Sequence, residues 1–400
     1  MEERIPPESG EDGKTSYAPN AETETEVYAR PIAQKKPSRL KYWLKTVFML
    51  ALIGFSVAIM FSVGDYISDG KQLSFSELVQ TIDYPMLALF LGVIVAYLLV
   101  ESTKYAYLLK VFTGKFHVKT ALKTTIVGKY YDGVTPFSSG GQPFQVIYLH
   151  KKDIPKGAAT AVPLAKFIVS TTTWCIFCLV LICCGPSYLS ASANVTVTTT
   201  ILIIACVSIG VNVAIPIGIM IFSFFPGMGR KLMAKLTYVL KKLHLVKKRY
   251  ATTKKYVTEV NEYCKSIRQV FTKWKLLLPL VLICLCECVL NISIPFFAVI
   301  SIANIPPTVE LYFQIICLNA IAQFAAYMMP TPGSTGAMET TASLTFMTIT
   351  GIDPVVGWIV LVWRFFTFYI YILSGMGMSI FEVIRDTYRQ RKSKKRTNIE

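Results

Sequence analysis

Eight ionisable residues interrupt the apolar segments of this 400-residue chain, and they are the side chains best suited to do chemistry. A charge inside an apolar segment is costly, so each is a candidate for a functional role. They are Glu101, Lys104, Lys129, Asp132, Lys166, Glu287, Glu339 and Arg364. Arg364 stands out because residues 355–378 carry no other charge. Its guanidinium can hold a phosphate through two parallel hydrogen bonds, which predicts an anion-binding role.

Simpler interpretations exist for the same residues. Arg364 can instead form a buried ion pair with Glu287 or Glu339. Glu339 lies one turn beyond Gly336, where a carboxylate can also accept a cationic ligand group or carry a proton. Both interpretations stay open at the level of the sequence.

The remaining charges have structural alternatives as well. Lys129 and Asp132 are three residues apart, so on a helix they can pair with each other. Glu101, Lys104 and Lys166 lie within reach of the ends of their apolar segments and can extend toward water. This ranks these three below Arg364 as functional candidates.

Two polar, glycine-rich stretches break long apolar segments. The first break offers Thr135, Ser138, Ser139, Gly140, Gly141 and Gln142. The second break offers Thr331, Gly333, Ser334, Thr335 and Gly336. Hydroxyl groups and free N–H groups at the start of a half-helix form a natural phosphate site. The alternative is that both stretches are packed hinges or exposed turns.

The composition excludes several classes of protein. Hydrophobic residues make up 53% of the chain and charged residues 16%, whereas a soluble domain carries about 25% charge. The net charge of +17 is concentrated in residues 228–275 and 385–400, which argues against a DNA-binding protein and makes tRNA an improbable partner. The cysteines lie mainly in apolar runs, and no zinc or nucleotide-binding motif is present. We therefore expect no metal and no cofactor.

The pattern of apolar segments predicts an all-α polytopic membrane protein. Full spans are expected at 43–63, 86–109, 158–185, 198–225, 276–300 and 355–383. Only 27 residues separate Lys123 from Lys151, and both flanks are basic, so residues 123–150 are expected to enter and leave the membrane on one side. Residues 311–348 are expected to form a second such hairpin from the opposite side. Eight to ten ordinary helices are the alternative.

The domain organisation follows from these segments and from the charge. Residues 1–38 read as a disordered tail. Two membrane halves, 39–227 and 276–384, flank a basic amphipathic linker, 228–275, which is expected to lie on an anionic lipid surface. A basic tail covers 385–400. The positive segments place both termini in the cytoplasm.

Three motifs resemble those of the lysylphosphatidylglycerol synthase transmembrane (flippase-like) family. They are the stretch from Gly128 to Gln145, the stretch from Pro330 to Glu339, and the segment from Trp363 to Tyr369. Ser334 and Thr335 stand where the family usually has small apolar residues. The chain continues only to Glu400, so the aminoacyl-transferase domain of the full-length relatives is expected to be absent.

The resemblance implies a bacterial plasma-membrane protein that handles phospholipids, in its best-known members aminoacylated phosphatidylglycerol. Opposed broken helices near the membrane midplane are typical of transporters. The leading hypothesis is therefore a phospholipid translocase that holds the lipid phosphate between the two breaks. Its rivals are a phosphatidylglycerol lysyltransferase or a subunit of one, with a separate synthase as partner, and a membrane scaffold that transports nothing.

Overall fold

A computed structural model describes residues 73–184, 195–225, 270–327, 329–351 and 353–378, together with a few isolated positions. Contacts divide the chain into two units, residues 1–48 and 49–400, and everything below concerns the second unit. The predicted tails, most of the predicted span 43–63 and most of the linker 228–275 lie outside the described residues. Those assignments stay predictions.

The described residues are helical and contain no β-strand, so the predicted all-α fold is confirmed. The long helices are α4 (Tyr84–Thr113), α7 (Lys156–Cys184), α9 (Val195–Phe224) and α12 (Trp274–Ala303). Helix α15 (Asp353–Arg364) continues through a π-helical turn, η1 (Phe365–Tyr369), into a helical segment that reaches Met378. A short helix, α3 (Phe75–Thr81), precedes α4.

Six of the described helical segments are long and apolar enough to cross a membrane. Five of them coincide with predicted spans. The sixth is α13 (Val309–Tyr327), which the sequence assigns to the second hairpin rather than to a full span. A hairpin arm of 19 residues is long enough to span about 28 Å as a helix, which explains why length alone does not separate the two classes.

Local signals in the sequence set the ends of α4. The Asp83 carboxylate accepts a hydrogen bond from the Met86 backbone N–H at 3.1 Å, and Pro85 occupies the first turn, where no N–H is required. At the other end Gly114 adopts φ +75°, a left-handed conformation that terminates the helix. These caps fix where the apolar segment begins and ends.

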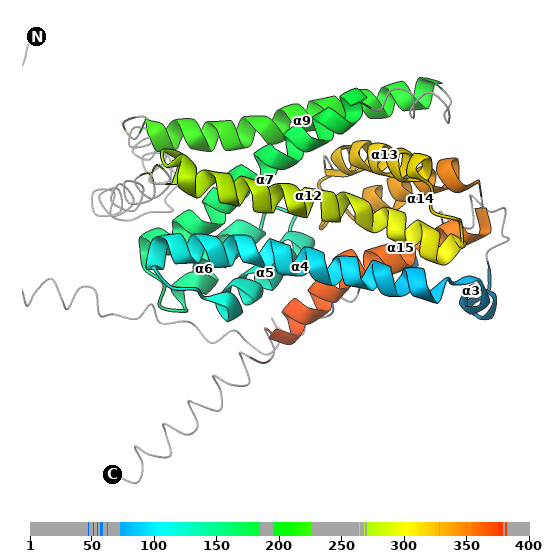
Figure 1. Cartoon of the computed structure of the whole chain (residues 1–400), viewed down its shortest axis with the longest axis horizontal. Helices are drawn as coiled ribbons and strands as arrows, with labels where there is room; N and C mark the ends of the chain where they lie inside the picture. The colour runs from blue at the N-terminus through cyan, green and yellow to red at the C-terminus, as the bar shows by residue number, and fades with distance from the viewer. Residues whose placement is uncertain are drawn as a thin grey trace, which may run out of the picture. The chain divides into compact units, whose positions relative to one another are not determined.

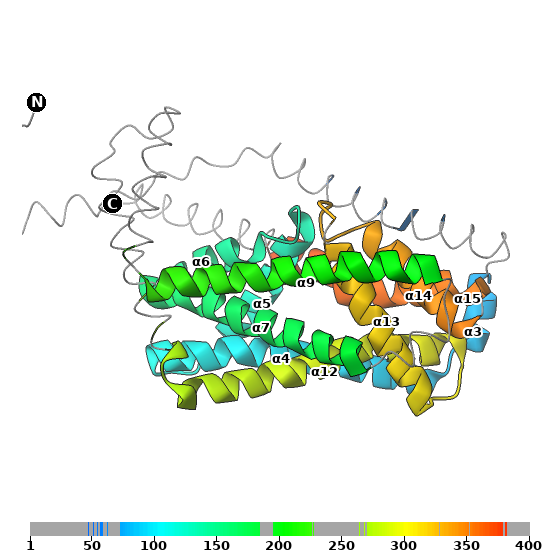
Figure 2. The ribbon, with the colours of Figure 1, turned by 90° about the horizontal axis from the view of Figure 1, so that it is seen from above.

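Two helix pairs are broken where the sequence predicts. Helices α5 (Val118–Val134) and α6 (Gly141–His150) flank the first break, and α13 and α14 (Ala337–Thr350) flank the second. The two pairs lie at opposite ends of the long helix α4 in both views (Figures 1 and 2). Their tips meet through one antiparallel bridge between Pro136 and Pro332. The opposed hairpins of the predicted fold are therefore present.

Charge separates the two ends of the bundle. Helix α4 ends, α5 and α7 begin, and α6 ends at one end of the bundle (Figure 1). Those helix ends carry the lysines at positions 110, 119, 123, 151, 152 and 156. Around α3, the start of α4 and the start of α13, the described charged residues are Glu77, Asp83 and Glu310. This asymmetry is typical of a protein that crosses a membrane with its basic end in the cytoplasm.

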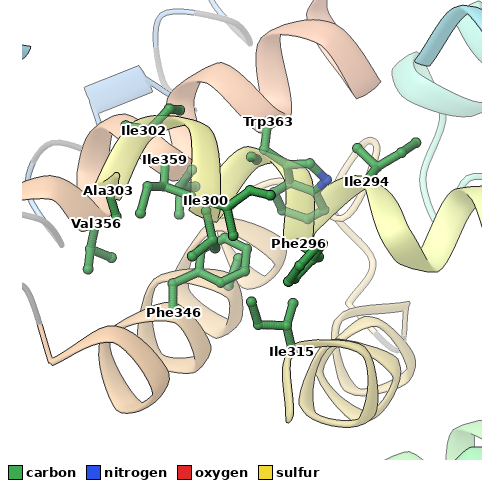
Figure 3. Close-up of a cluster of buried hydrophobic side chains, with 14 of the residues drawn as sticks. Ile294, Phe296, Ile300, Ile302, Ala303, Ile315, Phe346, Val356, Ile359 and Trp363 are labelled. Atoms are coloured by element: carbon green, nitrogen blue, oxygen red, sulfur yellow. The ribbon is translucent and has the colours of Figure 1, made fainter. Parts of the chain in front are cut away.

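The largest apolar core surrounds the second hairpin. Ile300 of α12, Ile315 of α13, Phe346 of α14 and Ile359 of α15 are buried against one another (Figure 3). Trp363 packs edge-on against Phe346, with ring centroids 6.1 Å apart. This packing holds α15 against the hairpin and so fixes Arg364, the next residue, near its tip.

Candidate functional site

The two hairpin tips are built from the same six-residue turn. Residues 135–140 read Thr-Pro-Phe-Ser-Ser-Gly, and residues 331–336 read Thr-Pro-Gly-Ser-Thr-Gly. In both turns the third and fourth residues have φ between +49° and +58°. In both, the first carbonyl accepts the N–H of the fourth residue, at 3.2 Å in the first turn and 3.1 Å in the second. The final glycine of each turn then caps a half-helix.

The tips lie in close contact with each other and with η1. A Cβ atom added to Gly333 would lie 2.3 Å from the Phe368 ring and 3.2 Å from the Gly133 carbonyl oxygen. A Cβ atom on Gly133 would lie 3.1 Å from the same ring. Only glycine fits at position 333, because the backbone there is both left-handed and pressed against an aromatic ring.

Arg364 and Glu339 form a buried ion pair at this contact. Arg364 Nε donates to Glu339 Oε1 at 2.7 Å, and Arg364 Nη2 donates to the Gly333 carbonyl at 3.4 Å. The Glu339 side chain is fully buried and that of Arg364 is 6% exposed. The guanidinium also lies over the Phe368 ring, 4.1 Å from its centroid. Of the two partners that the sequence allows for Arg364, the structure selects Glu339.

A carboxylate of the chain occupies the start of each half-helix. Glu339 Oε2 accepts the Gly336 N–H at 2.7 Å, and Asp132 Oδ1 accepts the Gly141 N–H at 2.7 Å. The positive end of each half-helix is therefore already neutralised by a protein anion. A ligand phosphate must displace a carboxylate to bind there. The sequence does not reveal that these positions are already occupied.

The hydroxyl groups of the tips bond mainly to their own backbone. Thr335 Oγ1 donates to the Pro332 carbonyl at 2.8 Å, and Ser139 Oγ donates to the equivalent Pro136 carbonyl at 2.9 Å. Ser334 Oγ is buried and has no hydrogen-bond partner among the residues that the structure describes. An unpaired buried hydroxyl costs free energy, so Ser334 is the tip residue best placed to meet a ligand or a water.

In the part of the chain that the structure describes, the remaining predicted residues of the tips form no hydrogen bond to the Arg364–Glu339 pair, and the two threonines bond to backbone groups instead. Thr135 Oγ1 accepts the Gly140 N–H at 2.8 Å and donates to the Tyr131 carbonyl at 2.7 Å. Thr331 Oγ1 donates to the Thr335 carbonyl at 2.8 Å. Ser138 and Gln142 are half-buried at the first tip. Thr135 and Thr331 thus close the two six-residue turns.

A second group of charges lies apart from the tips, between α4, α7 and α12. Lys104 pairs with Glu287 and, at 3.3 Å, with Glu101, whose other oxygen accepts from Lys166 at 2.7 Å. Lys104 also donates to Ser170 Oγ at 3.2 Å. Glu101 and Lys104 are buried. The expectation that these two extend toward water is therefore wrong, because each finds an opposite charge on a neighbouring helix.

This arrangement also changes the interpretation of Glu287 and Lys129. Glu287 belongs to the four-residue charge cluster and not to the tip site where the sequence places it. Lys129 donates to Tyr97 Oη at 2.7 Å and lies over the Tyr371 ring, whereas Asp132 binds Gly141. The two neighbours on α5 thus turn to different partners instead of pairing with each other.

Two features escape the analysis of the sequence but leave a signal in it. The repeated Thr-Pro-x-Ser-x-Gly turn is visible by comparing the two breaks residue by residue. The charge cluster is signalled only by two acids and two lysines, on three separate spans, at similar depth in their apolar runs. Which acid meets which lysine depends on how the helices pack.

Comparisons with known proteins agree with this architecture. A family model described as "Lysylphosphatidylglycerol synthase TM region" matches residues 47–375. A search of curated proteins and a search of solved structures found no significant match. The matched region contains both hairpins, the Arg364–Glu339 pair and the charge cluster. The chain therefore belongs to the lysylphosphatidylglycerol synthase transmembrane family.

Proposed function

We propose that this membrane protein moves a phospholipid from one leaflet to the other, with the headgroup passing between the two hairpin tips. The observation that carries the proposal is the meeting of two opposed broken hairpins, built from the same turn, at the buried Arg364–Glu339 pair. Irregular backbone at membrane depth is tolerated where it is buried in protein or lines a polar cavity. Opposed repeats of this kind are a device for alternating access.

The ion pair suggests how a headgroup would be held. In the described state Arg364 and Glu339 satisfy each other, so neither charge is left alone in an apolar environment. A lipid phosphate would take the place of Glu339 on the guanidinium, with two parallel hydrogen bonds. Glu339 would then be free to accept an ammonium group of the same headgroup, while the unpaired Ser334 hydroxyl would donate to the phosphate.

The family and the charge asymmetry give the proposal its setting. The basic end of the bundle would face the cytoplasmic side of a bacterial plasma membrane. Phosphatidylglycerol or its lysyl derivative would be the lipid, in keeping with the description of the family. The two halves would rock against each other, and the tips would separate to let the headgroup pass.

A lipid-movement assay in proteoliposomes tests this proposal. Fluorescent phosphatidylglycerol, lysyl-phosphatidylglycerol and phosphatidylcholine of equal chain length would be followed by chemical quenching of the outer leaflet. We expect headgroup-selective movement by the unaltered protein and its loss in Arg364→Ala. Phe365→Ala, a truncation of the half-exposed neighbouring side chain, is the matched control and should retain movement. Folded protein that moves none of the three lipids would contradict the proposal.

A further inference from the structure

A pocket of about 370 Å³ opens at the basic end of the bundle, apart from the hairpin tips. Its walls come from α5, from α6 and from the helical segment that follows η1. The segment packs closely there, because a Cβ atom on Gly375 would lie 2.3 Å from Tyr130. The pocket is therefore a defined space between three helices and not a gap between loosely placed ones.

Aromatic and aliphatic side chains form most of the wall. Tyr131 of α5 and Phe144 of α6 stack with their ring centroids 3.5 Å apart and their planes 2° apart. Ile147, one turn further along α6, is 49% exposed and lines the same space. A wall of this kind suits a hydrocarbon chain, and Tyr130 and Tyr148 add hydroxyl groups to it.

Three lysines give the pocket its charge. Lys123, Lys151 and Lys152 line it, and no carboxylate is found among the described lining residues. Lys152 is half-buried, with its ammonium group 5.5 Å from the centroid of the Tyr148 ring. Basic pockets between membrane helices at the cytoplasmic side are suited to the headgroups of anionic lipids.

The inner end of the pocket adjoins the first hairpin tip. Tyr131 lines the pocket, and its backbone carbonyl accepts the Thr135 hydroxyl of the six-residue turn at 2.7 Å. Asp132, the next residue, holds the start of α6. Lys151 and Lys152 follow the opposite end of α6, so a headgroup bound among the lysines would lie about 15 Å from the tip along α6, with its acyl chain running toward the tip.

We propose that this pocket binds a phospholipid of net negative charge, with its phosphate among the three lysines and one acyl chain along the Tyr131, Phe144 and Ile147 wall. A volume of about 370 Å³ holds a headgroup and the start of a chain, while the rest of the lipid stays in the bilayer. A cationic aminoacylated headgroup is repelled by the three lysines. The role of the pocket, to load phosphatidylglycerol before it reaches the tips, rests on the proposed function with phosphatidylglycerol rather than its lysyl derivative as the lipid moved.

Lipid binding can be measured without transport. The full chain in detergent would be titrated with phosphatidylglycerol, phosphatidylcholine and lysyl-phosphatidylglycerol of equal chain length, and bound lipid counted by native mass spectrometry. The test variant is Lys123→Gln/Lys151→Gln/Lys152→Gln. The matched control is Lys115→Gln/Lys119→Gln/Lys156→Gln, which removes three exposed charges outside the pocket.

The expected results distinguish lipid binding in the pocket from general attraction of anionic lipid to the basic surface. The pocket variant should bind phosphatidylglycerol about tenfold more weakly, because charge-assisted hydrogen bonds to the phosphate are lost. The control should lose less than about twofold. Ile147→Trp, which fills the apolar wall, should weaken binding while keeping every lysine, and Val118→Trp on the exposed side of α5 should not.

Three results would overturn the inference. They are equal losses in the two triple variants, unchanged binding in the pocket variant, and lysyl-phosphatidylglycerol bound as tightly as phosphatidylglycerol. Failure of the proposed function is distinguishable. Lipid movement in vesicles without binding at the pocket would reject the pocket alone, and binding as predicted without movement of any lipid would reject translocation alone.

Discussion

At the scale of single residues, the balance of buried charges dominates this protein. The eight ionisable residues that interrupt the apolar segments are four acids and four cations, and each has an opposite charge or a polar group within hydrogen-bond distance. Breaking a buried pair is far more costly than exchanging it for apolar groups. A ligand that separates such a pair must therefore supply the charge or hydrogen bonds that the displaced partner supplied.

The Arg364–Glu339 pair allows a test of this balance. Glu339→Leu alone and Arg364→Met alone should each lower the free energy of unfolding by about 3–5 kcal/mol, because each leaves one buried charge without its partner. The double variant should be more stable than either single variant, yet it should not move lipid. Thermal unfolding in detergent measures the first effect. Losses that simply add in the double variant would show that the two residues do not interact.

Lys104 is expected to be a structural residue rather than a ligand-binding one. Lys104→Met removes the cation shared by Glu101 and Glu287 and should destabilise the protein by about 3 kcal/mol or more. Lys119→Met, at an exposed site near the start of α5, should change stability by less than about 0.5 kcal/mol. Equal thermal stability of the two variants would mean that the cluster contributes little to the fold.

At the scale of elements, the hairpin tips depend on left-handed turns that press against a neighbouring helix. Gly333 and Gly351 have nearly the same φ, +58° and +60°. A side chain at Gly351 meets nothing within 4 Å, whereas one at Gly333 meets the Phe368 ring. Substitutions at these two glycines therefore separate the cost of backbone strain from the cost of disturbing the contact between the tip and η1.

Alanine at these two glycines should give different results. Gly351→Ala should cost about 1 kcal/mol of stability from strain alone and leave lipid movement intact. Gly333→Ala should cost more and should slow lipid movement, because the tip must shift away from Phe368. Unfolding and vesicle assays on both variants measure this. Identical behaviour of the two would argue that the close contact at Gly333 has no functional role.

The elements were largely predictable from the sequence, but their partners were not. Proline and glycine clusters locate both breaks, because Thr135–Gly141 and Pro330–Gly336 cannot continue a helix. The choice of Glu339 rather than Glu287 for Arg364 depends on the packing of α15 against α14. Periodicity along one helix carries no information on such contacts between helices, so the pairing within the charge cluster and the neutralised half-helix starts could not be foreseen.

At the scale of the whole molecule, the two opposed hairpins touch at their tips, the parts that would move in transport. The bridge between Pro136 and Pro332 is the point where both six-residue turns meet. If lipid passes between the tips, this contact must open in every cycle. A molecule that only scaffolds other proteins has no need to open it.

Locking the tips together tests this claim most directly. Paired residues of an antiparallel bridge have Cα atoms about 4.5–5.5 Å apart, which is within the range of a disulfide. Lipid movement would be measured in Pro136→Cys/Pro332→Cys after oxidation and again after reduction, with each single variant treated identically. We expect oxidation to stop movement in the double variant only and reduction to restore it. Full movement with the tips completely cross-linked would contradict this expectation.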